Sequence, residues 1–247
     1  MLKKLTRISV PNEDVTLWRF MPIENYLSLV TSKTLHFTRA SAFDDPWEGE
    51  YPDWVMDIMK QYRADDMPSF FAHTAVAKDL MYISCWHQNS NESAAMWKIY
   101  GRAECSVAIT TTIPRFKESA SAPYRKNLWY GKIRYIDYSI VQSGPNKPEE
   151  VFFWKRKSFS HEKEVRFVTK LERKDVTKSE DSSEIIRLTD TPTHVGMPVE
   201  LSKLIDRVYV DPMSKDYLFK SVQEITRQYC GETVAVEKSK LYDRRFY

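Results

Sequence analysis

The chain has 247 residues, of which 42% are hydrophobic and 13% aromatic, enough apolar surface to bury a core. Its 37 basic and 34 acidic residues leave a formal net charge of only +3, so the overall charge selects no class of partner. No apolar run approaches the length of about 18 residues that predicts a membrane span, and no export signal opens the chain, so we expect a cytoplasmic protein.

The three cysteines, Cys85, Cys105 and Cys230, are odd in number and widely spaced. This pattern excludes a disulfide scaffold that pairs all of them and a Cys-x-x-Cys metal clip. The histidines are equally scattered, so their spacing indicates no zinc site, and no metal is predicted.

The first third of the chain predicts two strands around a helix. Residues 17–20 and 35–38 have the pattern of short strands, and residues 23–30 place apolar side chains at helical spacing after Pro22. A turn follows at residues 44–50, where aspartate precedes proline and Gly49 is permissive. Residues 51–80 mix helix signals with prolines and predict a helical insertion.

The remaining two thirds alternate strands and helices. We expect strands at 81–86, 105–112, 132–138, 207–210 and 234–236, and helices at 92–100, 149–159 and 212–229. Asn91 is the predicted N-cap of the first of these helices, and Gly101 ends it. Without repeats or a long linker, residues 1–247 predict one α+β domain with mixed, mostly antiparallel sheets and flanking helices.

Acidic and basic residues alternate with apolar ones between His161 and Val168. In a strand, Glu162, Glu164 and Arg166 would share one face, while Val165 and Phe167 would enter the core. Two neighbouring carboxylates repel each other unless a cation or hydrogen-bond donors hold them. This segment is therefore the first candidate for chemistry.

The segment just before these acids is basic and aromatic, with Trp154 and Phe159 among the cations. Cations neutralise phosphates and aromatic rings stack on bases, so the composition favours nucleic acid. The predicted nucleic-acid-binding residues are Lys155, Arg156, Lys157 and Arg166.

Three segments together resemble a widespread bacterial family catalogued as a domain of unknown function. The first is residues 43–48 (FDDPWE), and the third is residues 153–166, which end in HEKEVR. The second is residues 85–100, with Cys-Trp at 85–86, Glu-Ser at 92–93, Met-Trp at 96–97 and Tyr at 100. The resemblance extends over residues 17–241, nearly the whole chain. It implies no activity.

A more distant resemblance links the opening of the chain to ADP-ribosyltransferases, particularly the toxins that modify nucleic acids. It depends on residues 17–20, the following helix and the strand at residues 34–38. The resemblance implies an ADP-ribosyltransferase-like fold and NAD as substrate. Arg19 would bind NAD, Thr38 or Ser41 would pack the nicotinamide, and Glu164 would be catalytic, with Glu162 two residues earlier.

These residue types suit that chemistry. A carboxylate such as Glu164 would stabilise the oxocarbenium-like ribose that forms when the nicotinamide bond breaks. Arg19 would hold the pyrophosphate, and Glu162 would orient or deprotonate the acceptor. The aromatic candidates for stacking on nicotinamide or on a base are Trp86, Trp97 and Tyr100.

The sequence therefore predicts an ADP-ribosyltransferase acting on RNA or single-stranded DNA. Such an enzyme would harm its own cell, which suggests a toxin with a neutralising partner protein, or an anti-phage effector. One alternative is a magnesium-dependent nuclease or phosphodiesterase, with ligands drawn from Asp44, Asp45, Glu48, Glu92, Glu162 and Glu164. The other is a non-enzymatic nucleic-acid-binding module.

Overall fold

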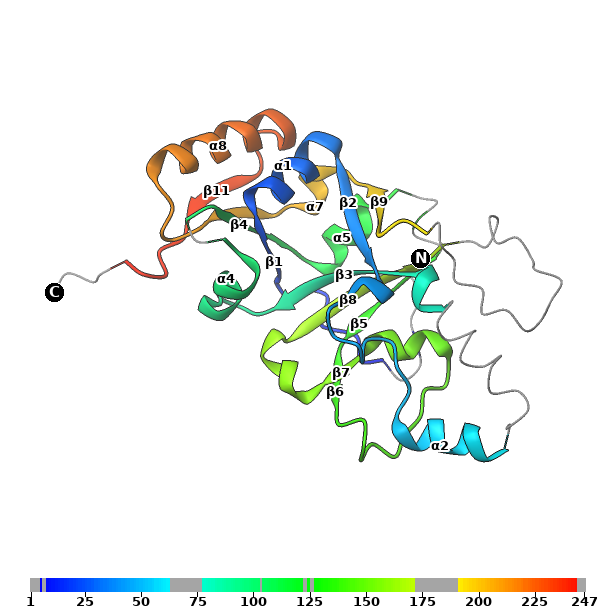
Figure 1. The fold of residues 1–247 in the computed structure, drawn as a ribbon. Helices are drawn as coiled ribbons and strands as arrows, with labels where there is room; N and C mark the ends of the chain where they lie inside the picture. Colours follow the sequence, from blue (N-terminus) through cyan, green and yellow to red (C-terminus); the bar gives the residue numbers. More distant parts are fainter. Residues whose placement is uncertain are drawn as a thin grey trace.

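The computed structural model describes residue 5 and residues 8–62, 77–102, 104–121, 124, 127–171 and 191–243. Nine of the described strands form one large sheet (Figure 1). Its first unit consists of strand β1 (Leu17–Pro22), helix α1 (Ile23–Ser32) and strand β2 (Thr34–Arg39). The strand–helix–strand order predicted for this region is confirmed.

Strand β3 (Met81–Gln88) is the centre of the sheet. Along one edge it pairs antiparallel with β8 (Glu164–Lys170), from Met81 opposite Lys170 to His87 opposite Glu164. On the other edge β3 pairs with β2 only at Tyr82 and Ile83, and with β1 only at His87 and Gln88. Strands β1 and β2 therefore diverge beside the middle of β3.

The other strands extend the sheet on both sides. Strand β4 (Ser106–Thr111) pairs with β1, β10 (Arg207–Val210) with β4, β9 (His194–Pro198) with β2, and β5 (Leu128–Lys132) with β8, all antiparallel. Strand β11 (Ala235–Lys238) joins β10 in parallel. A separate parallel pair joins β6 (Arg134–Ile136) to β7 (Trp154–Arg156). The predicted α+β architecture with mixed, mostly antiparallel sheets is confirmed.

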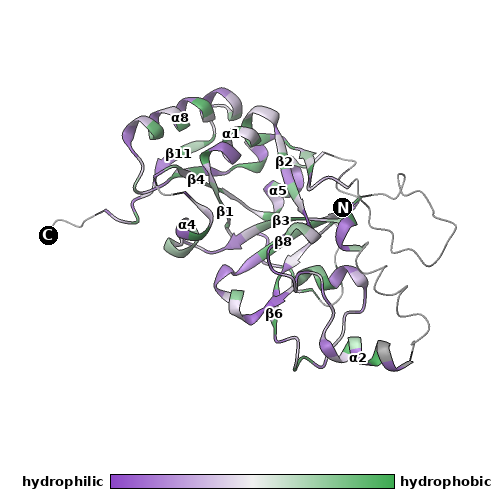
Figure 2. Cartoon of the chain, in the orientation of Figure 1, coloured by the Kyte–Doolittle hydropathy of each residue, from purple (hydrophilic) through white to green (hydrophobic). Residues whose placement is uncertain are grey.

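Beyond α1, further helices connect the strands of the described chain. They are α2 (Asp53–Tyr62), α4 (Ala94–Tyr100), α5 (Ile113–Ser119), α7 (Leu201–Leu204) and α8 (Asp216–Cys230), with 3-10 turns η1 (Ala40–Ala42), η2 (Pro148–Phe153) and η3 (Lys157–Glu162). Helix α8 lies beside α1 (Figure 1). It carries hydrophilic and hydrophobic residues along its length (Figure 2), with Val222 and Cys230 buried. No described helix has the length and hydropathy needed to cross a bilayer.

Several local predictions are corrected. The segment 149–159 forms η2, β7 and the start of η3 instead of one helix. The cap of α4 is Ser93, whose Oγ accepts a hydrogen bond from the Met96 amide at 3.4 Å, rather than Asn91. Elements β5, α5 and β9 were not predicted. Helix α2 lies within the predicted insertion at 51–80, of which residues 63–76 fall outside the described residues.

The largest core cluster lies against β3 and β8. Val165 and Phe167 are fully buried in it, as the alternation of β8 predicts. The Phe167 ring stacks on Phe116 with 3.5 Å between the ring centroids. Because one face of β8 is anchored in this core, Glu164 and Arg166 point to the opposite face.

Candidate functional site

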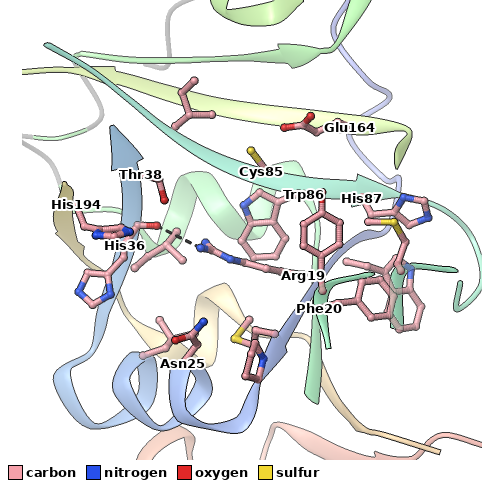
Figure 3. A pocket seen from close by; sticks show the side chains of 18 of the residues that line it. Arg19, Phe20, Asn25, His36, Thr38, Cys85, Trp86, His87, Glu164 and His194 are labelled. Atoms are coloured by element: carbon pink, nitrogen blue, oxygen red, sulfur yellow. Dashed lines mark hydrogen bonds between the residues drawn. The ribbon is translucent and has the colours of Figure 1, made fainter. Parts of the chain in front are cut away.

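A cavity of about 520 Å³ is lined by residues of β1, β2 and β3, where β1 and β2 diverge (Figure 3). The first residue of β8 and the last residue of η3 also line it. Segments far apart in the sequence thus share one cavity. Six of the predicted site residues line it: Arg19, Thr38, Trp86, Tyr100, Glu162 and Glu164.

The half-buried Arg19 side chain bridges the gap between the diverging strands. Its Nη1 donates to Ser84 Oγ on β3 at 2.8 Å, and its Nη2 donates to the His36 carbonyl on β2 at 3.3 Å. The guanidinium also lies 5.7 Å from the centre of the Trp86 ring. Burial lowers the pKa of Arg19, but an arginine remains charged at neutral pH. The cavity therefore has a fixed cation on one wall.

Five buried ionisable residues form what we call the charge cluster: Glu48, Lys155, Glu162, Glu164 and Arg166. Lys155 Nζ lies 2.5 Å from Glu162 Oε2 and 3.5 Å from carboxylate oxygens of both Glu48 and Glu164. Arg166 donates through Nε to Glu164 Oε1 at 2.7 Å. It also binds both oxygens of Glu48, at 2.7 and 2.8 Å.

Three carboxylates thus share two cations, which leaves one excess negative charge on the charge cluster. Two of the three carboxylate residues, Glu162 and Glu164, line the cavity. The cavity consequently carries positive charge on the wall formed by β1 and negative charge where β8 begins. A ligand or transition state with separated charges of both signs would match this arrangement.

The chain geometry around the two cavity-lining acids differs from the expected continuous strand. Strand β8 begins at Glu164, and Glu162 is the last residue of η3. Between them Lys163 adopts a left-handed conformation with φ of 42°. The prediction that Glu162 belongs to the strand face is therefore wrong, yet this turn still brings its carboxylate to Lys155.

The electrostatic environment keeps Glu164 ionised. Burial by itself raises the pKa of this carboxyl, but the Arg166 guanidinium and the Lys155 ammonium outweigh burial and hold the pKa below its usual value. Nearby on β3, burial and the Glu164 carboxylate raise the pKa of the Cys85 thiol well above its usual value. At neutral pH the site therefore combines a carboxylate with a protonated thiol.

Glu162 is held by neighbours outside the charge cluster as well. The Tyr100 hydroxyl donates to Glu162 Oε1 at 2.9 Å. Burial and this carboxylate raise the pKa of Tyr100, which stays a neutral donor. The His87 ring lies with Nδ1 2.5 Å from the Glu162 carbonyl oxygen, so Nδ1 carries the proton and donates it. These contacts hold both the side-chain carboxylate and the backbone carbonyl of Glu162 in place.

Two predicted NAD-binding residues lie elsewhere. Ser41 is exposed, donates to Asp79 Oδ1 at 2.5 Å, and does not line the cavity. Trp97 is only 4% exposed, and its Nε1 donates to Glu92 at 3.0 Å while its ring packs against Phe20. Helical spacing grouped Trp97 with Tyr100, but packing turns Trp97 into the interior.

Of the four residues predicted to bind nucleic acid, two are buried and two keep surface exposure. Arg166 is fully buried and Lys155 is 7% exposed, and both donate to buried carboxylates. Neither can reach a macromolecule, so this role is corrected for both. Arg156 pairs with Asp45 at 2.8 Å but keeps 41% of its side chain exposed, and Lys157 is exposed. These two line a separate cavity of about 350 Å³.

Sequence reasoning missed several contributors. Glu48 was considered only as a metal ligand, whereas it is the partner of Arg166. Ser84 accepts hydrogen bonds from both Arg19 and the Trp86 indole. His36 and His194 line the β2 side of the cavity and point toward the same region (Figure 3). No local pattern marks these residues, because their partners lie on other strands.

No family model and no curated relative matches the chain, so the resemblance to the uncharacterised bacterial family stays a prediction. Among solved structures, the chain is similar to DarT of Thermus sp. 2.9. The structure of DarT in complex with ADP-ribosylated single-stranded DNA aligns with this chain at a TM-score of 0.42 and 12% sequence identity. The alignment covers 94% of this chain and 98% of the DarT chain.

Two further complexes of that protein align as well. The complex with carba-NAD+ has a TM-score of 0.42 and 11% identity, over 93% of this chain and 98% of the other. The complex with NAD+ has a TM-score of 0.38 and 12% identity, over 94% and 98% of the two chains. Values below 0.5 do not establish a shared fold, so a functional assignment must come from the site itself.

Proposed function

We propose that this protein is a NAD-dependent ADP-ribosyltransferase with an ADP-ribosyltransferase-like fold, and that its acceptor is RNA or single-stranded DNA. The observation that carries the proposal is that Arg19 and the buried acids Glu162 and Glu164 line one cavity. Arg19 precedes the two acids by more than 140 positions in the sequence. Only the fold brings these residues to the same walls.

The cavity suits NAD in size and in charge. Its volume of about 520 Å³ falls within the range of about 300–1,000 Å³ that is typical of small-molecule sites. NAD carries a negative pyrophosphate and a positive nicotinamide riboside. Arg19 would hold the pyrophosphate, which places the riboside toward the acidic end of the cavity.

Glu164 is the proposed catalytic carboxylate. Cleavage of the bond between nicotinamide and ribose C1′ sends the bonding electron pair to the ring nitrogen, so positive charge moves onto the ribose. An ionised Glu164 stabilises that charge more strongly in the transition state than in the ground state. Arg166 and Lys155 act as positioning residues, since they hold Glu164 ionised and oriented.

Glu162 is assigned to the acceptor. A hydroxyl or amine of the nucleic acid attacks C1′, and its proton passes to the Glu162 carboxylate. The products are neutral nicotinamide, the ADP-ribosylated acceptor and one released proton. Tyr100 and Lys155 hold the two oxygens of Glu162, while Thr38 and Trp86 supply cavity walls for NAD.

Nucleic acid is the proposed acceptor because two cations follow Lys155 in the chain and keep surface exposure: Lys157 is exposed, and Arg156, although paired with Asp45, keeps 41% of its side chain exposed. Modification of nucleic acid would damage the cell. The proposal therefore includes action in the cytoplasm as a toxin or anti-phage effector, restrained by a neutralising partner protein.

The nuclease alternative finds less support. Among the described residues, the oxygens of Glu48, Glu162 and Glu164 converge on Lys155 and Arg166 instead of facing one another across an open centre. Asp45 pairs with Arg156, and Glu92 binds Trp97 and Ser239. Cations hold four of the carboxylates that a magnesium site would need, and neutral donors hold Glu92.

The test is incubation of the purified protein with separate pools of RNA, single-stranded DNA and protein, in one arm with NAD labelled in the adenylate part and no magnesium, and in a second arm with magnesium and no NAD. We expect label on a nucleic-acid pool, lost in Glu164→Gln and kept in Glu118→Gln, a matched change at an exposed position of α5. Label on protein alone would overturn the acceptor class. Magnesium-dependent cleavage of nucleic acid without NAD would overturn the reaction, and nucleic-acid binding without any NAD cleavage would support the binding module.

A further inference from the structure

A second cavity of about 600 Å³ adjoins the start of β8. Its walls come from the end of β3, the β5–β6 region, the segment before β1 and the turn at Lys163. Glu164 lines this second cavity as well as the first. The residue proposed as catalytic therefore separates two hollows, of which the proposed function uses only one.

Four polar side chains of the second cavity are unmatched within the part of the chain that the structure describes, whereas its Tyr135 hydroxyl and Glu164 carboxylate already have partners. Lys132 and Lys163 form no ion pair there, and the side-chain amides of Gln88 and Asn89 form no hydrogen bond. The acid Asp14 is exposed at the same cavity. Two cations and two amides that combine donors and acceptors thus remain available for a ligand.

The backbone at Lys163 keeps the two cavities chemically distinct. Its left-handed conformation, with φ of 42°, is uncommon for a residue other than glycine. The backbone N–H of Gln88 donates a hydrogen bond to the Lys163 carbonyl at 2.9 Å and holds the turn in place. Glu162 lines the first cavity and not the second, whereas Lys163 lines the second and not the first. The turn sends the acid and its neighbouring cation to opposite hollows.

We propose that the second cavity binds one unpaired nucleotide of the single-stranded acceptor, next to the one that is modified. This inference rests on the proposed function and names the acceptor subsite of the same centre. Lys132 and Lys163 contact the phosphate, which carries the affinity. The amides of Gln88 and Asn89 contact the edge of the base, as such side chains do in recognition of unstacked bases.

The experiment measures binding of a fluorescent single-stranded oligonucleotide by anisotropy over a series of salt concentrations, without NAD. We expect Lys132→Ala/Lys163→Ala to weaken binding by about tenfold at low salt, and to reduce the slope of log K against log salt by about 0.7, the value for one neutralised phosphate on a single strand. Lys132→Arg/Lys163→Arg is expected to retain binding. The matched control Lys220→Ala/Lys240→Ala removes two exposed lysines outside both cavities and should bind like the wild type.

Thermal unfolding of each variant shows whether it is folded, and the arginine pair tests the site even where the alanine pair unfolds. Unchanged affinity and salt slope in the folded alanine pair would overturn the inference, and so would equal affinity of the wild type for a polyglutamate peptide. If binding depends on both lysines but no NAD is cleaved, the subsite stands and the proposed function fails. If NAD is cleaved but oligonucleotide affinity does not depend on the two lysines, the proposed subsite is wrong and the proposed function stands.

Discussion

The ammonium of Lys155 lies 2.5 Å from the carboxylate of Glu162, and both side chains are buried. The same ammonium reaches Glu48 and Glu164 at 3.5 Å. One lysine therefore holds three acids that come from a turn, a 3-10 turn and a strand. Lys155 is therefore, together with Arg166, one of the two positions on which the buried acids of the charge cluster depend.

Replacement of Lys155 by methionine should destabilise the fold strongly. The change leaves three buried carboxylates with Arg166 as their remaining cation in the charge cluster, and removal of one partner from a buried ion pair costs about 3–5 kcal/mol. Urea denaturation at pH 7 measures the loss. The double variant Lys155→Met/Glu162→Gln should recover part of it, because an unpaired charge is removed; strictly additive losses would contradict the coupling.

The free energy of unfolding should decrease as the pH is lowered, and part of that decrease should depend on Glu164. Its pKa is held below the usual value in the folded protein, so the unfolded chain binds the proton more readily and stability rises with pH. The contribution is complete above the unfolded pKa of about 4.3 and is lost as the pH falls through the folded pKa. Unfolding free energies between pH 7 and pH 3 should show a shallower acid loss in Glu164→Gln than in Glu118→Gln. Identical slopes would count against an ionised, ion-paired Glu164.

Arg19→Lys should weaken NAD binding by about tenfold, equivalent to about 1.4 kcal/mol. A lysine cannot donate at once to Ser84 and His36 while presenting a planar fork to the pyrophosphate. Isothermal titration with NAD against the Glu164→Gln background, which slows turnover, measures the change. Wild-type affinity in the lysine variant would remove Arg19 from the binding site.

The backbone at Lys163 can be tested separately from its charge. Lys163→Gly should be tolerated with little change in folding free energy, because glycine adopts φ of 42° without strain, whereas the β-branched Lys163→Val should lose about 1–2 kcal/mol. Chemical denaturation of both variants gives the comparison. A valine variant as stable as the glycine variant would show that the turn is not required.

Strands and helices with strong periodicity were predictable from local sequence. Residues 17–38, β8 and α8 carry apolar residues at the spacing of 2 or 3.6. The apolar face of β8 is buried as predicted, with Val165 and Phe167 fully enclosed, but its charged face is buried as well. Segment 149–159 was not predictable in the same way. Its apolar residues Phe152 and Phe153 pack under the neighbouring strands, and that tertiary contact overrides the helical pattern.

The sequence by itself determined the α+β class, the apolar face of β8, and the residue types that carry charge at the candidate site. Tertiary structure alone decided which charges meet. It drew Lys155 and Arg166 inward to neutralise Glu48, Glu162 and Glu164, and it brought Arg19 into the gap where β1 and β2 diverge from β3. The physical reason is that periodicity reports which face of an element is apolar. The partner of a buried charge is set by strands distant in sequence, and a charge without a partner could not remain buried.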